Sequence, residues 1–455
     1  MVFVPLLLTW VAAAALALMD GRRRSVGWLA VGALAAGLAA TAVLAGMVLD
    51  GGARETVAGD WPPGIGIVLR ADALGVVFAV VSGVVLLAAL AYEVAAGVSS
   101  RLFPAVVLFL ATGLTGLFLT ADVFSFYVFF ELSMIAAYVL AYYGGEARQL
   151  GAGFIFAVVN LLGSFLFLLA VAGTYHVTGT LAMETVAQRI AGVEPNTVIL
   201  IAVGFFVAFG VKLGLFPFHF WLPTVYVSAS PSVAAMLSGA VANIGSYGLL
   251  RFGAGILPAE LRLGAVALII LGTASIVYGA IQAVSRRTAA EVLAYSAVGQ
   301  AGYVLIALGV GGPVGLAAAV VYSLANALNK ALLFLSVELR GWLVGAAFVI
   351  GAFSVAGIPP TAGFFGKVEL FRAGVAEDSV ALVALIFLGG AVSFLYMFQI
   401  YQHDFWRGER RGAASPRALR GMAVGLAVVV VTLGLWPEPL LAAGRRAAEV
   451  LMGPT

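Results

Sequence analysis

Two stretches interrupt the apolar segments of this sequence in the same way: FGVKLGLFPFHFWLP at residues 209–223 and AGIPPTAGFFGKVELF at residues 356–371. Each places prolines, glycines and one lysine in an otherwise apolar span. Proline removes a backbone donor and clashes with the preceding turn, so a helix kinks or breaks there. Unwound backbone at membrane depth is tolerated only where it is buried in protein or lines a wet cavity. Two such spans in corresponding halves predict an inverted-repeat transporter.

Composition places the chain in the membrane. Only 10% of its 455 residues are charged and its mean hydropathy is +1.11, whereas a soluble protein of this size exposes far more charge. The chain contains no cysteine, which excludes disulfides, thiolate metal sites and iron–sulfur clusters. The net charge of +3 is spread over short loops, so we expect no nucleic-acid partner.

Segments of about 20 mostly apolar residues, the length needed to cross a bilayer, recur along the chain. We expect about 14 of them, at 2–19, 26–49, 73–97, 102–121, 122–143, 151–177, 196–221, 229–253, 263–284, 291–311, 313–338, 342–371, 378–402 and 419–441. The first is interpreted as a retained span because its charges follow the apolar run. The fold class is therefore an all-α polytopic membrane protein with two inverted five-helix repeats, each with a broken helix.

We expect four divisions of the chain: a three-helix segment (1–101), a first repeat (102–254), a second repeat (255–403), and a C-terminal helix with its tail (404–455).

An even number of spans puts both termini on one side of the membrane, and the arginines predict which side. The connections on the side of the GRRRS loop carry thirteen: Arg22, Arg23, Arg24, Arg101, Arg148, Arg286, Arg287, Arg340, Arg407, Arg410, Arg411, Arg417 and Arg420. The opposite side carries eight: Arg54, Arg70, Arg189, Arg251, Arg262, Arg372, Arg445 and Arg446. Cytoplasmic loops are rich in Lys and Arg, so we expect a multi-pass protein of the cell membrane with both termini extracytoplasmic.

The only three lysines, Lys212, Lys330 and Lys367, lie inside apolar stretches. A lysine can give up its proton when desolvated, whereas an arginine effectively cannot. Ionisable residues inside a membrane are costly and by default functional candidates. This distribution indicates movement of protons or ions through the bilayer.

Glu131 lies in the middle of the apolar stretch DVFSFYVFFELSMIAAYVLAYY, two spans before Lys212. A carboxylate at that depth must be neutral, paired or hydrated. We expect Glu131 and Lys212 to meet as a pair that keeps the lysine protonated and releases the proton when the partners separate. The alternative is a static buried ion pair that only fixes helix register.

Lys330 lies in VVYSLANALNKALLFL, with Asn326 one turn before it on the same face. Such a polar stripe suits a water-filled path, although asparagine also joins membrane helices by hydrogen bonds. Lys367 follows the second break and is a further candidate, with snorkelling to the interface as its alternative. His219, beside the first break, could relay a proton or serve as a structural hydrogen-bonding group.

The sequence contains no phosphate-binding loop, nucleophile elbow, two-histidine metal motif or haem pattern. We therefore expect an ion transporter rather than an enzyme, with no cofactor and no metal.

Several motifs together resemble one family. They are VFFELSMIAAYVL around Glu131, GVKLGLFPFHFWLPTVYVSASPSVAAMLSG around Lys212, VLAYSAVGQAGYVL, ANALNKALLFL around Lys330, and AGIPPTAGFFGK around Lys367. They are similar to the antiporter-like subunits shared by respiratory complex I, membrane-bound hydrogenases and Mrp-type cation/proton antiporters. The resemblance implies that Glu131 and Lys212 form a pair central to proton transfer. It also implies that Lys330 continues a hydrated axis, and that Lys367 links this axis to an exit or to the next subunit.

The sequence departs from the family pattern at two positions. Asn243, in SGAVANIGSYGLLR, stands where the family usually carries a lysine, and Asn326 stands where a histidine is usual. Asparagine can hold water or hydrogen-bond a neighbour, but it cannot store a proton. A complete proton path through this one subunit is therefore in question at these two positions.

The FFELSMIAAYVL context, YHVTGTLAM and YMFQIYQHDFWRG most resemble the D-type subunits of Mrp complexes. This implies a proton-translocating subunit of a multi-subunit Na⁺/H⁺ antiporter that assembles in the lipid bilayer with a subunit-A homologue and handles protons and sodium. Two alternatives remain open. One is a proton-pumping subunit of complex I or a membrane-bound hydrogenase, and the other is a structural scaffold with a degenerate path.

Overall fold

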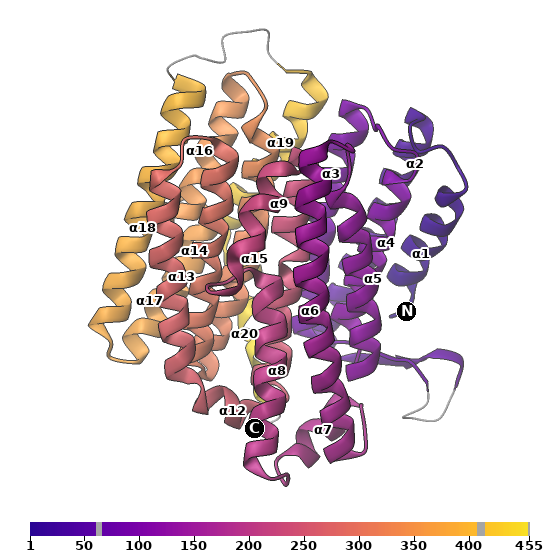
Figure 1. Ribbon diagram of the computed structural model, residues 1–455, viewed down its shortest axis with the longest axis vertical. Coiled ribbons are helices and arrows are strands. Elements are labelled where there is room, and N and C mark those ends of the chain that lie inside the picture. The colour runs from indigo at the N-terminus through magenta and orange to yellow at the C-terminus, as the bar shows by residue number, and fades with distance from the viewer. Residues whose placement is uncertain (61–65, 407–414, 454–455) are drawn as a thin grey trace.

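The computed structural model describes residues 1–60, 66–406 and 415–453 of the chain. Long helices stand side by side along the long axis of the molecule (Figure 1). The N-terminal helices lie on the right of this view, α17 and α18 lie on the left, and α15 lies between them. The lower end carries the short helices α7 and α12.

Eleven helical segments are long and apolar enough to cross a membrane, and three shorter apolar helices accompany them. These helices are α1 (Val4–Ala17), α2 (Arg24–Gly51), α3 (Ala73–Ala96), α4 (Phe103–Leu119), α5 (Val123–Ala141), α6 (Ala147–Thr178), α8 (Pro195–Leu213), the composite helix Pro231–Ala254, α13 (Ala265–Ser285), α14 (Ala289–Val310), α15 (Gly312–Val337), α16 (Trp342–Ala356), α18 (Val380–Tyr401) and α19 (Arg417–Leu435). Each predicted span overlaps one of them, which confirms the all-α polytopic fold.

Shorter elements fill the connections. They are the antiparallel strands β1 (Arg54–Val57) and β2 (Val68–Ala71), the single turn η1 (Ala58–Asp60), α7 (Met183–Ile190), η2 (Phe218–Trp221), α9 (Leu222–Ser228), α12 (Pro258–Leu263), α17 (Ala362–Ala376), η5 (Gln402–Trp406) and α20 (Glu438–Met452). The composite helix consists of α10 (Pro231–Met236), the π-helical turn η3 (Leu237–Val241), α11 (Asn243–Gly248) and the π-helical turn η4 (Leu249–Ala254).

Both predicted breaks are present. Helix α8 ends at Leu213, and Gly214 follows with φ 67° before the chain resumes as η2 and α9. Helix α16 ends at Ala356, and Gly357 follows with φ 82° before α17 begins. Glycine adopts this left-handed conformation without a Cβ penalty, so it ends helices readily. In each predicted repeat the break falls in the fourth of five spans.

The polar backbone of the two breaks is satisfied inside the protein. At the first break, the Trp221 indole donates to the Val211 carbonyl at 2.9 Å, and the Phe216 amide donates to Ser275 Oγ at 3.0 Å. At the second, the Gly363 amide donates to Ser354 Oγ at 2.9 Å. Unwound chain at this depth requires such partners.

The most buried helices form the centre of the molecule. The apolar windows of the composite helix and of α15 are each 94% buried, whereas those of α13 and α19 are 28% buried. Helix α15 contacts α14, α16, α17, α19 and α20. Polar side chains on α14, α15 and the composite helix therefore lie away from lipid.

The prediction was wrong at the C-terminal end of the last span. Instead of continuing to residue 441, α19 ends at Leu435, and a separate helix, α20, starts at Glu438 after Pro437. Helix α20 packs against α15 and α3 through an apolar face that includes Leu440 and Leu451.

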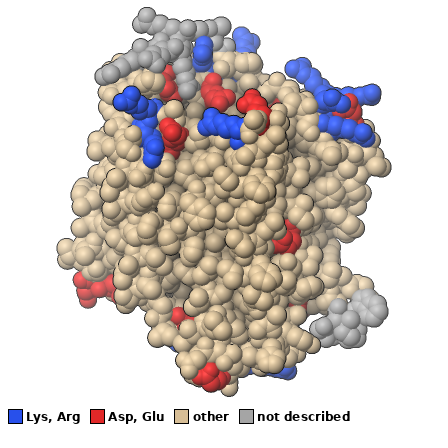
Figure 2. All heavy atoms as spheres, in the orientation of Figure 1, with Lys and Arg blue, Asp and Glu red and all other residues tan. Residues whose placement is uncertain are grey.

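Basic side chains gather at the upper end of the molecule, above a wide belt with few charged side chains (Figure 2). That end carries the connections between α1 and α2 and between α13 and α14 (Figure 1). Arg407, Arg410 and Arg411, and the end of the YMFQIYQHDFWRG motif, lie outside the described residues.

Candidate functional site

Lys212 is 3% exposed and lies in the last turn of α8. Its ammonium group donates to the carbonyl oxygen of Asn160 at 2.8 Å and to Ser164 Oγ at 3.1 Å, both on α6. It also lies 4.5 Å from the ring centroid of Phe130 on α5. Three helices therefore hold this charge immediately before the break.

Glu131 follows Phe130 on α5, but the structure places its carboxylate differently from the expectation of a contact pair. In the described part of the chain no ion pair joins it to Lys212, and its Oε1 atom is buried without a hydrogen-bond partner. The residue as a whole is only partly buried. Val128 and Ile135, on either side of it along α5, are 49% and 57% exposed. Glu131 thus lies between the Lys212 region and the outer face of the molecule.

Two small cavities with shared lining residues lie between Lys212 and the centre. The first, of about 10 Å³, is lined by Lys212, Asn160, Tyr226 and Ala242 among others. The second, of about 20 Å³, is lined by Tyr226, Ala242, Asn243 and Asn326 and by three serines, Ser238, Ser246 and Ser323. We call this second one the asparagine cavity. A polar cavity of this size is large enough for a water molecule.

Asn243 and Asn326 therefore face the same space, although the sequence separates them widely. Asn243 donates to Ser82 Oγ on α3 at 3.0 Å and to the carbonyl of Gly239 at 3.2 Å. The Oδ1 atom of Asn326 is buried and has no hydrogen-bond partner among the described residues. The two positions where the sequence departs from the family pattern border one hydratable cavity.

Lys330 lies one turn beyond Asn326 on α15 and is 1% exposed. Its ammonium group donates to Ser296 Oγ at 2.8 Å and to the Leu293 carbonyl at 3.3 Å, both on α14. Ser296 hydrogen-bonds the Tyr396 hydroxyl of α18 at 3.0 Å. The charge of Lys330 is therefore anchored to a hydroxyl network rather than to a carboxylate.

The network continues towards the second break. The Gln300 side-chain amide donates to the Tyr396 hydroxyl at 3.4 Å, and the Tyr322 hydroxyl donates to the Gln300 carbonyl oxygen. The ring of Tyr322 lies 5.2 Å from that of Tyr303. Lys367 Nζ lies 5.0 Å from the centroid of the Tyr303 ring. Polar groups on α14, α15 and α18 thus lead from Lys330 to the neighbourhood of Lys367.

Lys367 is 3% exposed and does not reach the surface, contrary to the snorkelling alternative. Its Nζ atom has no hydrogen-bond partner within the described ranges. The neighbouring acid, Glu369, forms an ion pair of 2.9 Å with Arg372 instead. Lys367 is therefore a buried amine whose hydrogen bonds are not supplied by the described part of this chain.

His219 stands apart from this path. Its ring packs against Tyr278 at 4.4 Å and Phe216 at 5.5 Å, on the side of α13. Its Nδ1 atom has no hydrogen-bond partner in the described structure. The described contacts of His219 are aromatic, so they support neither the hydrogen-bonding alternative nor a relay.

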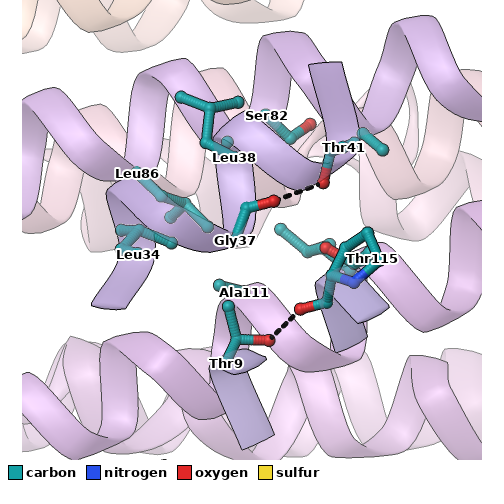
Figure 3. A pocket seen from close by; sticks show the side chains of 13 residues that line it. Thr9, Leu34, Gly37, Leu38, Thr41, Ser82, Leu86, Ala111 and Thr115 are labelled. Atoms are coloured by element: carbon teal, nitrogen blue, oxygen red, sulfur yellow. Dashed lines mark hydrogen bonds between the residues drawn. The ribbon is translucent and has the colours of Figure 1, made fainter. Parts of the chain in front are cut away.

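Another cavity, of about 10 Å³, lies between the N-terminal helices (Figure 3). Thr9 and Thr41 point towards it, and their hydroxyls donate to the Pro5 and Gly37 carbonyls of their own helices. Because these hydroxyls are already bonded, the cavity fits helix packing. Ser82 borders it and links it to Asn243.

Sequence reasoning missed Ser296, Gln300, Tyr303 and Tyr396. Their one signal was the motif VLAYSAVGQAGYVL, which carries three of them at near-helical spacing in an apolar span. Tyr396 opens the motif YMFQIYQHDFWRG, but nothing in that motif pointed to a place beside Lys330.

Comparisons with known proteins identify the family of this chain. The family described as "NADH:quinone oxidoreductase/Mrp antiporter, TM" matches residues 120–393, which include both breaks and all three lysines. The chain is 30% identical to the D-type Na(+)/H(+) antiporter subunit of Alkalihalophilus pseudofirmus over 87% of this chain and 86% of that protein.

Solved structures share the whole fold. A chain of the Mrp complex from Dietzia sp. DQ12-45-1b superposes with a TM-score of 0.91 and 28% identity, over 100% of this chain and 97% of that chain. A chain of respiratory complex I from Thermus thermophilus superposes with a TM-score of 0.84 over the full length of both chains. At 24% identity, the second likeness shows the fold alone.

Proposed function

We propose, from the premise that this chain belongs to the NADH:quinone oxidoreductase/Mrp antiporter transmembrane family, that it is the proton-translocating D-type subunit of an Mrp Na⁺/H⁺ antiporter. The observation that carries the proposal is the line of buried cations at the centre. Lys212, Lys330 and Lys367 are each 3% exposed or less, and cavities and side-chain hydrogen bonds follow one another between them. Its relatives are named as antiporter subunits rather than as enzymes.

Proton movement along this line needs charges that can change partners. Lys212 is bonded only to neutral oxygens, while Glu131 lies beside its aromatic neighbour Phe130. Two unit charges about 4 Å apart attract by roughly 4 kcal/mol at an effective dielectric constant of 20. A small shift of α5 towards α8 therefore stabilises the protonated lysine, and the reverse shift favours proton release to the asparagine cavity.

The position of Glu131 also supports a partner subunit. A carboxylate at mid-membrane is costly on a lipid-facing surface, yet Glu131 is partly exposed between Val128 and Ile135. We propose that another subunit of a hetero-oligomeric complex, which includes a subunit-A homologue, covers this face of α5. Protons and a monovalent cation, sodium in the proposal, are the transported species.

The distribution of arginines supports the orientation. The upper end, where basic side chains gather in Figure 2, is proposed to be cytoplasmic. Both termini would then lie on the extracytoplasmic side of the cell membrane. The predicted boundaries of the four divisions, 1–101, 102–254, 255–403 and 404–455, remain part of this proposal.

The first test replaces Lys212 in the assembled complex. We expect Lys212→Ala to lower sodium-dependent proton exchange in vesicles by on the order of 100-fold, because a transfer group is removed. Lys212→Arg is the matched control: it keeps the positive charge but cannot release a proton, and it too should be inactive. Full exchange by either assembled variant would contradict the role of Lys212.

A second candidate function is a proton-pumping subunit of a redox complex, which the shared fold with a respiratory complex I chain supports. Purification in mild detergent with identification of the partners distinguishes the two. Small membrane subunits with a subunit-A homologue favour the antiporter. Iron–sulfur or flavin subunits would favour the pump and remove the sodium assignment.

A further inference from the structure

Helix α3 and the composite helix pair with each other along their length. At the upper end, Ser232 Oγ donates to Glu93 Oε2 at 2.6 Å. In the middle, Asn243 donates to Ser82 Oγ at 3.0 Å, and at the lower end Arg251 meets Asp72 at 2.7 Å. The two helices are therefore antiparallel, and polar groups occupy both ends and the centre of the seam between them.

The lower half of this seam starts at the asparagine cavity. Asn243 lines that cavity, and Tyr247 lies one turn below it on the same face of α11. Arg251 lies one further turn along and donates to the Tyr247 hydroxyl from Nε at 3.1 Å and from Nη2 at 2.9 Å. Asn243, Tyr247 and Arg251 thus form a polar stripe that descends from the centre.

The stripe ends at a large hollow, which we call the lower basin. It has a volume of about 1170 Å³ and is lined at the lower end of the molecule by β2, α7, α12 and the α14–α15 connection. Asp72 and Arg251 belong to its wall. The exposed ion pair between Arg70 and Glu184, at 2.8 Å, stands on the same wall.

The contact between Asp72 and Arg251 lies between the basin and Tyr247. The side chains are 5% and 13% exposed. Arg251 Nη2 lies 2.7 Å from Oδ1 and from Oδ2 of Asp72. The Tyr247 hydroxyl donates to the Phe118 carbonyl at 2.9 Å, and its ring packs on that of Phe118 at 4.9 Å. The charged pair and the Tyr247 ring therefore lie between the basin and Asn243, and the ring also packs against Phe78 and Phe126.

We propose that the Asp72–Arg251 pair is a gate, closed in this structure, on a branch that joins the asparagine cavity to the lower basin. Separation of the two side chains frees Arg251 to swing into the basin and releases its hold on the Tyr247 hydroxyl. Water can then reach Asn243 from the lower side. The inference rests on the proposed function in one respect: it takes the central cavities to be part of a proton path.

A purely structural ion pair would have the same geometry, because Asp72 also caps α3 by accepting a hydrogen bond from the Gly75 amide at 2.9 Å. The two roles differ in one measurable property. A structural pair, when broken, lowers the stability and activity of the complex. A gate, when broken, also raises passive proton conductance.

The substitution Asp72→Asn separates these roles, because asparagine caps helices about as well as aspartate but cannot neutralise Arg251. The assay reconstitutes the complete complex in liposomes, imposes a pH gradient without sodium, and follows an entrapped pH dye. We expect proton leak per assembled complex to rise by ~10-fold or more, because Arg251 without its buried partner is an uncompensated charge that turns towards the basin and leaves the Tyr247 hydroxyl. Glu184→Gln, which breaks the exposed pair on the same wall, is the control and should match the wild type.

A further variant traces the route of the leak. Asn243→Leu has a similar volume and removes the polar group at the top of the stripe. The double variant Asp72→Asn, Asn243→Leu should therefore return the leak to the wild-type rate. A leak that persists in the double variant, or a wild-type leak in assembled Asp72→Asn, overturns the gate.

If Asp72→Asn fails to assemble, Arg251→Lys decides the question, because lysine keeps the charge but cannot form the forked contact with Asp72 and Tyr247. A leak above wild type supports the gate, and a wild-type leak overturns it. The proposed function has its own test: it fails if sodium-driven proton exchange survives in the Lys212→Ala variant. The leak assay contains no sodium gradient, so the two failures are distinguishable.

Discussion

The two broken helices carry their lysines on opposite sides of the break. Lys212 precedes Gly214, and its ammonium group is held by two oxygens of α6. Lys367 follows Gly357, and its side chain folds back over that glycine. No hydrogen bond from the described residues reaches its ammonium group. At the first break the lysine is hydrogen-bonded to neutral oxygens, and at the second the lysine has no hydrogen-bond partner among the described residues.

This difference indicates a division of labour. The first half contains Glu131 near Lys212, so charge can be exchanged within it. Around Lys330 and Lys367 the described contacts are hydroxyls, amides and rings, and the adjacent acid Glu369 is engaged with Arg372. We infer that the first repeat, with Glu131 and Lys212, controls when a proton is held or released. The second repeat, with Lys330 and Lys367, conducts the proton onward.

The largest effect on proton flux is expected when both lysines of the second repeat are removed. The double variant Lys330→Ala, Lys367→Ala should lower proton flux by on the order of 100-fold, because both cations of the second half are lost. The measurement is proton flux in vesicles that contain the assembled complex. Normal flux in this variant would show that the second half does not conduct, and the comparison would then fail.

An intermediate effect sharpens the contrast between the two breaks. A Cβ at Gly357 would lie 2.5 Å from Lys367 Cδ, whereas one at Gly214 would lie 2.4 Å from Leu222 Cδ1. Gly357→Ala and Gly214→Ala should each cost about 1–2 kcal/mol of stability, because both positions have positive φ.

Only Gly357→Ala displaces a lysine, so its proton flux should fall several-fold further than that of Gly214→Ala at matched assembly. Thermal unfolding and flux, measured on both variants, provide the comparison. Equal flux in the two variants would mean that the position of Lys367 over the glycine is unimportant.

The smallest expected effect concerns the start of the helix that carries Lys212. Hydrogen bonds from the Asn196 and Thr197 amides lower the pKa of the exposed Glu194 carboxyl at the N-cap of α8. A carboxyl with a lowered pKa stabilises the folded state above its ordinary value near 4.5, and this contribution is lost as pH falls through the folded value. Between pH 7 and pH 4, the unfolding temperature of Glu194→Gln should therefore fall less than that of the wild type. An identical fall in both proteins would exclude a contribution from this cap.

The helices were predictable because each is a long apolar run, and the breaks were predictable because proline and glycine interrupt those runs. Helix α20 was not predicted because Glu438, Arg445 and Arg446 lower the mean hydropathy of its sequence. A search for long apolar segments therefore does not detect its apolar face. The β-hairpin and α7 lie in polar connections where periodicity gives little signal.

The sequence predicted the individual lysines of the candidate site but not the residues that surround them. A lysine in an apolar run is conspicuous, so the three cations were identified from composition. Their surroundings were not, because Ser296, Gln300 and Tyr396 come from two helices that only the tertiary fold brings together. The expected contact between Glu131 and Lys212 likewise depended on helix rotation, which spacing along the chain does not specify.

The lower basin has an electrical consequence. Water in a hollow of about 1170 Å³ conducts far better than the surrounding helices, so the potential of the lower compartment extends inward to its wall. The transmembrane voltage then falls across a thinner layer than the full bilayer. A charge that crosses the whole drop gains about 2.3 kcal/mol per 100 mV. The Asp72–Arg251 pair lies where that drop begins, so the membrane potential acts directly on the contact between these two side chains.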